Sequence, residues 1–135
     1  MAENTVVKEQ LTKEMIEAGA HLTQKLDESG LPIPVAMWFF MPDINEWRLF
    51  FASPEVSRTG SRDVYRQIEK ARKKLGVEAE HVPLSVIGVL DTNHELAHLL
   101  RVALQTGPEL SRVRFSKNVI NGRFIDDALV YRSAA

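Results

Sequence analysis

The chain has no cysteine among its 135 residues. This absence excludes disulfides, thiolate zinc sites, cysteine-held iron–sulfur clusters and cysteine nucleophiles. It suits a reducing compartment, so we expect a cytoplasmic protein. The first residues lack a basic segment followed by an apolar one, so we expect no signal peptide. The longest apolar run, Val35–Met41, is too short to cross a bilayer, and we expect no membrane partner.

The chain also has little net charge, with 17 Lys and Arg against 18 Asp and Glu. Such a balance gives no overall attraction to nucleic acid or to a membrane. The charges are unevenly spread, however. Residues 1–56 carry four basic and nine acidic side chains, whereas residues 57–75 carry seven basic and two acidic ones. This asymmetry indicates either an anionic partner or a self-complementary assembly.

The first half of the chain predicts a helix, a β-hairpin and a second helix. Thr12 is the expected N-cap of the first helix, and Gly30 is its expected end. Residues 34–41 and 47–52 predict a hairpin whose first strand is apolar on both faces and therefore central. Residues 53–60 predict a loop, after which Ser61 caps a helix that ends at Gly76.

The second half predicts a strand, a helix and a final hairpin. Residues 84–90 form the expected third strand, and residues 91–93 open a helix that Gly107 and Pro108 close. Residues 112–120 and 123–131 flank Asn121-Gly122, the strongest short-range signal for a type I′ hairpin. In that register the numbers of opposing residues sum to 243, which pairs Lys117 with Asp126.

The element order α-β-β-α-β-α-β-β predicts one α+β domain over residues 12–135. We expect a mixed or antiparallel sheet of about five strands with three helices against it. Residues 1–11 are expected to form a tail or a short edge strand at residues 5–7. The aromatic side chains of the predicted first hairpin present more apolar surface than short helices easily cover. This excess favours burial in a homodimer.

The run His94-Glu95-Leu96-Ala97-His98 resembles the H-E-x-x-H signature of the zincin metallopeptidases. In such a run the two histidines share one face of a helix and bind zinc, while the glutamate acts as general base. The resemblance implies His94 and His98 as metal ligands, Glu95 as the catalytic residue and zinc as the cofactor. A third ligand would come from Glu109 or from an aspartate of the last hairpin.

A structural interpretation of the same run remains open. Thr92 and Glu95 fit a capping box, which gives the glutamate a role in starting the helix. The apolar stripe of this helix turns both histidines toward solvent. The stripe consists of Leu96, Leu99, Leu100, Ala103 and Leu104. The extended zincin signature is also missing, because Arg101 and Leu104 replace its glycine and third histidine.

A basic segment over residues 58–74 gives a second candidate site. Its outward side chains could contact phosphates, and they are Arg58, Arg62, Arg66, Lys70 and Lys73. The alternative is a solvated helix face on which Glu69 pairs with Lys73. Asp126 and Asp127 form a third candidate, a carboxylate site in a cleft, although adjacent strand residues should project to opposite faces.

The chain contains no G-x-S-x-G elbow, Walker loop or G-x-G-x-x-G motif. The sequence therefore favours a non-enzymatic interaction or regulatory domain that associates with itself or with a protein partner. Two alternatives remain, a zinc-dependent hydrolase that uses residues 94–98 and a nucleic-acid-associated protein that uses the basic helix. We expect no cofactor except zinc in the first of these alternatives.

Overall fold

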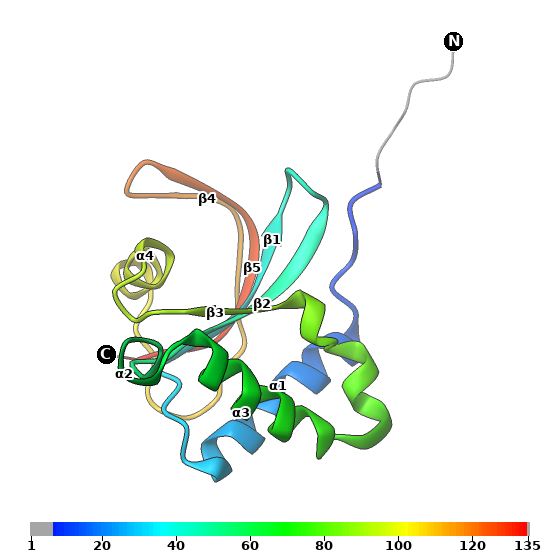
Figure 1. Ribbon diagram of the computed structural model, residues 1–135. Helices are drawn as coiled ribbons and strands as arrows, with labels where there is room; N and C mark the ends of the chain where they lie inside the picture. Colours follow the sequence, from blue (N-terminus) through cyan, green and yellow to red (C-terminus); the bar gives the residue numbers. More distant parts are fainter. Residues whose placement is uncertain (1–6, 135) are drawn as a thin grey trace.

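Five strands form one mixed sheet in the computed structural model, which describes residues 7–134 (Figure 1). The strands are β1 (Val35–Met41), β2 (Glu46–Ala52), β3 (Ile87–Leu90), β4 (Val113–Ile120) and β5 (Arg123–Ser133). Their order across the sheet is β3-β2-β1-β5-β4. β2 and β3 pair in parallel, and the other three pairs are antiparallel. The α+β class and the central place of β1 are confirmed.

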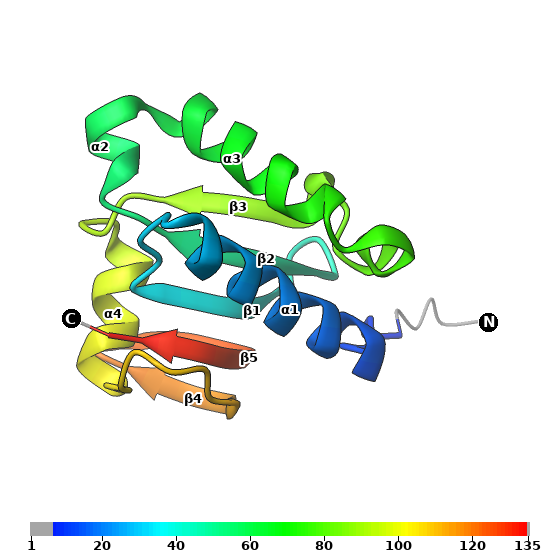
Figure 2. The same cartoon turned by 90° about the horizontal axis from the view of Figure 1, so that it is seen from below.

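The helices lie on both faces of this sheet. They are α1 (Lys13–Ser29), α2 (Glu55–Thr59), α3 (Ser61–Lys73) and α4 (Glu95–Ala103), with short 3₁₀ turns η1 (Gly76–His81) and η2 (Leu84–Val86). α1 and α3 cover one face side by side, whereas α4 lies against the other (Figures 1 and 2). Within residues 7–134, no helix is both long and apolar enough to cross a bilayer.

Each face of the sheet has its own apolar core. Under α1 and α3, Trp38, Phe51 and Tyr131 are fully buried among leucines and isoleucines of the helices. Under α4, Met37 and Val130 pack against that helix. One chain thus covers both faces of the central hairpin, which removes the sequence argument for a homodimer built on its aromatic side chains.

The predicted ends of α1 are confirmed, and they have a clear physical basis. The Thr12 hydroxyl accepts a hydrogen bond from the Met15 amide at 3.1 Å, as an N-cap does. Gly30 follows the helix with φ of 84°, and its N–H donates to the carbonyls of Leu26 and Asp27. This left-handed conformation favours glycine, so the sequence fixes where the helix stops.

The last hairpin has the predicted register. β4 and β5 pair Val113 with Val130 and Phe115 with Ala128, and all their paired numbers sum to 243. Asn121 and Gly122 have φ of 49° and 77°, which a type I′ turn requires. Lys117 departs from the ladder with φ of 54°, but its side chain still forms the predicted ion pair with Asp126.

Several local predictions are wrong, among them the end of α3, which lies at Lys73 and not at Gly76. The predicted loop at residues 53–60 contains the short helix α2, because Ser53 organises a turn by accepting a hydrogen bond from the Glu55 amide. Gly60, not Ser61, precedes α3 as its N-cap. The predicted strand at residues 84–90 begins as η2 and becomes extended only at Ile87, where pairing with β2 starts. The third predicted helix is shorter at both ends and spans only Glu95–Ala103.

The segment before α1 lies along the sheet without regular structure over residues 7–12. The Trp47 indole donates to the Glu9 carbonyl at 2.8 Å, and Asn45 accepts from the Glu9 amide at 2.9 Å. Side chains of the β1–β2 hairpin therefore hold this segment in place. The expected edge strand at residues 5–7 falls outside the described residues except for Val7, which is exposed.

Candidate functional site

The zincin-like run begins a helix instead of lying within one. α4 starts at Glu95, and His94 is its N-cap, with the imidazole Nδ1 accepting from the Leu96 amide at 3.0 Å. The predicted Thr92 cap and its capping box are therefore wrong. The cause is a turn in which the Asp91 side chain accepts from the Asn93 amide and the Asp91 carbonyl from the His94 amide. The helix also ends early, at Ala103, because Leu104 is extended.

The side chains of the run do not converge on one point. His98 is exposed on α4, as predicted, while Glu95 forms an ion pair with Arg123 of β5. His94 has one ring nitrogen engaged in capping. Within residues 7–134, no cluster of three or more His, Asp or Glu side chains is arranged to hold a metal ion. Two histidines on one exposed surface are too few ligands for the zinc site that the run implies.

The basic residues of α3 do come together. Four of the five predicted side chains line one hollow of about 390 Å³ beside Tyr65 and Leu84, and they are Arg62, Arg66, Lys70 and Lys73. All four are exposed. Arg58 lies apart on α2, where it pairs with Glu55 at 2.8 Å. We call the surface lined by these four cations the basic hollow.

The basic hollow keeps most of its charge. Its one carboxylate, Glu69, is held by the Arg72 guanidinium through two hydrogen bonds of 2.9 and 3.0 Å, which lower the pKa of Glu69. Arg66 approaches Asp63 only to 3.8 Å. The predicted Glu69–Lys73 pair does not form, because Arg72 occupies that carboxylate. Four cations and one carboxylate give the lining a formal charge of +3.

A second hollow carries the opposite charge. It has a volume of about 480 Å³ and lies between the start of α1 and η1. Its lining residues are Lys13, Glu14, Glu17, Val77, Glu78, Glu80 and His81. With a neutral histidine, four carboxylates and one lysine give the lining a formal charge of −3. Arg112, outside the lining, pairs with Glu17 through two hydrogen bonds of 3.0 and 3.1 Å and so offsets one of these negative charges. We call this second hollow the acidic hollow. Its residues come from two segments about 60 positions apart in the sequence, and no sequence pattern predicted that they meet.

Asp126 and Asp127 form a structural ion-pair cluster. Asp127 accepts from Arg114 at 2.6 and 2.8 Å and from Lys8 at 3.0 Å. Lys8 also reaches Asp126, so the two carboxylates meet at one cation, contrary to the expectation that they face opposite sides. Lys8 lies 4.6 Å from the Phe40 ring centroid, which adds a cation–π contact. Because these cations neutralise both carboxylates, the cluster ties the N-terminal segment to the sheet.

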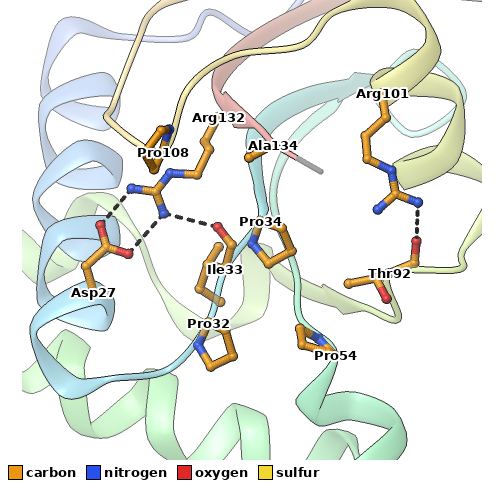
Figure 3. A pocket seen from close by; sticks show the side chains of 10 residues that line it. All are labelled: Asp27, Pro32, Ile33, Pro34, Pro54, Thr92, Arg101, Pro108, Arg132 and Ala134. Atoms are coloured by element: carbon orange, nitrogen blue, oxygen red, sulfur yellow. Dashed lines mark hydrogen bonds and ion pairs between the residues drawn. The ribbon is translucent and has the colours of Figure 1, made fainter.

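A cavity of about 640 Å³ lies near the ends of β1 and β5, and no motif predicted it (Figure 3). Its walls include Pro32, Pro34, Pro54 and Pro108. Two guanidinium groups face it from opposite sides, those of Arg132 and Arg101 (Figure 3). These residues come from five separate segments of the chain, which explains why sequence spacing gave no signal.

Comparisons of the chain with protein-family models, with curated proteins and with solved structures give no match.

Proposed function

We propose that this domain works by association between copies of the same chain, with the basic hollow of one copy binding the acidic hollow of the next. One observation carries the proposal: the two hollows have linings of opposite net charge. Complementary charge steers association and suppresses contacts between like surfaces. The basic hollow comes from the basic excess of residues 57–75, whereas the acidic hollow combines carboxylates of α1 with Glu78 and Glu80 of η1.

Apolar contacts at the same places add support. Val77 stands at the acidic hollow with 89% of its surface exposed, and Leu84 at the basic hollow is 38% exposed. A protruding valine side chain against a hollow that contains a leucine would bury apolar area, which charged rims alone do not supply. Each hollow thus combines a charged rim with an exposed apolar residue.

The proposed contact joins two different surfaces, so it is a head-to-tail contact. After a dimer forms, one copy keeps an unused acidic hollow and the other an unused basic hollow, so further copies can add at both ends. The expected species are therefore chains or rings whose average mass rises with protein concentration. An isologous dimer would instead stop at two copies.

The proposal assigns no chemical step to the domain. The side chains with catalytic chemistry are engaged in structural contacts: His94 caps α4, Glu95 pairs with Arg123, and Asp127 pairs with Arg114. This arrangement supports the non-enzymatic interpretation over the hydrolase alternative.

Charge reversal tests the proposal directly. Light scattering of the wild-type protein at low ionic strength should give a mass above that of the monomer, and about 0.5 M salt should lower it because salt screens surface charges. Arg66→Glu/Lys70→Glu and Glu14→Lys/Glu80→Lys should each be monomeric alone. When mixed they should form a one-to-one dimer that grows no further, because each variant retains one native hollow.

Arg58→Glu is the matched control, since it reverses a basic residue outside the hollow and should leave the mass unchanged. A wild-type protein that stays monomeric at millimolar concentration and low salt would contradict the proposal. So would hollow variants that keep the wild-type mass.

The same four cations favour a second candidate, nucleic-acid binding. They repeat along one face of α3, where successive phosphates could be contacted. Titration of duplex DNA against the Arg66→Glu/Lys70→Glu variant separates the two candidates. Wild-type binding that falls steeply with salt and is lost in this variant, from a protein that remains monomeric, would replace self-association by nucleic-acid binding.

A further inference from the structure

The cavity at the ends of β1 and β5 is built from rigid parts. Four of its ten lining residues are prolines, and Ile33 and Ala134 add apolar surface between them. Proline fixes the backbone angle φ, so a wall made of prolines has little freedom to collapse. Its volume of about 640 Å³ falls within the range of small-molecule sites, which is about 300–1,000 Å³.

One wall is fixed by an ion pair between buried Arg132 and the exposed carboxylate of Asp27. Arg132 is only 7% exposed, and its guanidinium contacts the Asp27 carboxylate through hydrogen bonds of 3.0 and 2.7 Å. It also donates to the Ile33 carbonyl at 3.1 Å (Figure 3). These bonds tie β5 to the end of α1 and to the segment before β1. Because Asp27 already neutralises Arg132, this pair adds structure but no net charge to the cavity.

The opposite wall carries an uncompensated cation. Arg101 of α4 donates from one terminal nitrogen to the Thr92 carbonyl at 2.8 Å (Figure 3). That bond fixes the guanidinium without neutralising it, and no carboxylate within residues 7–134 forms an ion pair with it. Two guanidiniums and one carboxylate give the cavity lining a formal charge of +1.

We infer that this cavity binds a small organic monocarboxylate with an apolar body. The carboxylate pairs with Arg101, whose planar guanidinium matches a carboxylate through two parallel hydrogen bonds. The apolar body lies against the prolines and Ile33. The net charge of +1 selects a single negative charge, and the proline walls select a body without polar groups. Self-association through the two hollows uses none of these residues, so the inference is independent of the proposed function.

The test uses hexanoate as the probe and hexanamide as its neutral counterpart. Titration of each into the full-length protein, followed by amide NMR shifts, should show saturable hexanoate binding with shifts of Arg101, Ile33 and Ala134. Hexanamide should bind at least about tenfold more weakly, since it lacks the charge-assisted pairing. Arg101→Gln should weaken hexanoate by a similar factor and leave hexanamide unchanged.

Two further variants complete the test. Arg123→Gln removes an exposed arginine on β5 outside the cavity lining and should leave hexanoate binding unchanged. Ala134→Leu fills part of the cavity and should weaken both probes. Equal affinity for the two probes, unaltered hexanoate affinity in Arg101→Gln, or NMR shifts confined to other surfaces would each overturn the inference. Thermal unfolding of each variant establishes that it is folded before its binding is compared.

Discussion

Gly19 of α1 lies where the helix touches the core most closely. A Cβ at this position would collide with the Tyr131 hydroxyl and lie 2.7 Å from the Trp38 indole nitrogen. Both aromatic side chains are fully buried and are joined by a hydrogen bond of 2.9 Å. The helix and the sheet can therefore approach this closely only with glycine at position 19.

Gly19→Ala should accordingly lower the free energy of unfolding. We expect a strain of about 1–3 kcal/mol, of which the higher helix propensity of alanine offsets up to about 1 kcal/mol. Urea denaturation measures the difference. In a Tyr131→Phe background the same change should cost less, because the colliding hydroxyl is gone. An equal cost in both backgrounds would show that the collision is not the cause.

Asp127 makes stability depend on pH. Burial alone would raise the pKa of its carboxyl, but the hydrogen bonds from Arg114 and Lys8 hold that pKa well below its ordinary value. A lowered pKa in the folded state stabilises the protein above the ordinary carboxyl pKa of about 4 and loses this contribution as the pH falls through the folded value.

Asp127→Asn should therefore lower the free energy of unfolding by about 1–3 kcal/mol at pH 7, as expected for lost hydrogen bonds to a charged group. The difference from the wild type should shrink between pH 5 and pH 2 in urea titrations. Asp43→Asn, in the exposed turn between β1 and β2, should have little effect at any pH. A difference in free energy of unfolding between wild type and Asp127→Asn that grows as the pH is lowered would refute this account.

Sequence patterns predicted the structural roles of single residues well where those roles depend only on neighbouring residues in the chain. Thr12, Gly30 and Gly122 have roles that depend on the backbone around them, and these predictions are confirmed. The roles of Gly19, Arg132 and Asp27 depend on partners about 100 residues away. Such contacts leave no mark in the spacing of neighbouring residues, so they could not be predicted.

At the level of elements, the position at which α4 starts gives His94 and His98 different surroundings. His94 accepts a hydrogen bond as N-cap, while His98 is exposed inside the helix. His94→Ala should lower the free energy of unfolding by about 0.5–1 kcal/mol, whereas His94→Asp should preserve or raise it, because a carboxylate caps the helix and favours its positive end.

His98→Ala is the control and should be neutral or slightly stabilising, because alanine has the higher helix propensity. Thermal unfolding of tag-free protein measures all three variants. Metal analysis of the same samples adds a check on the zincin resemblance. Stoichiometric zinc in the wild type that is lost in both alanine variants would restore the hydrolase alternative.

The elements that the sequence predicted best are those with signals at both ends. α1 has a cap and a terminal glycine, and the β4–β5 hairpin has its Asn-Gly turn. α2 has only five residues, which are too few to show the repeating apolar pattern by which a helix is recognised in a sequence. The predicted Thr92 cap failed because Asp91 competes for the same backbone groups, and a motif cannot show which competitor is stronger.

Across the whole molecule, the arrangement of layers predicts an order of protection from hydrogen exchange. β1 is paired on both sides and covered on both faces, so its amides should exchange only on global unfolding. β4 is an edge strand with mostly exposed side chains, and its outward amides should exchange fastest among the strands. Exchange followed by mass spectrometry checks this order, and a β1 that exchanges before β4 would contradict the sheet order.

The sheet order and the two hollows were beyond prediction from sequence, although the fold class was not. Alternation of apolar residues reports which face of a strand is buried, but not which strand lies beside it. The acidic hollow likewise depends on η1 lying against the start of α1, a contact between distant segments. The charge asymmetry indicated an anionic partner or a self-complementary assembly, and the fold determines where the charged surfaces lie.

The position of β5 has a consequence for synthesis. β5 comes last of the five strands in the chain, yet it lies between β1 and β4 inside the sheet. While the ribosome is still making the chain, the edge of β1 that β5 will occupy stays unpaired. This edge is apolar, and it stays open even after all the helices have emerged. The sheet can close only after β5 has emerged, and until then the unpaired edge of β1 is open to pairing with other chains.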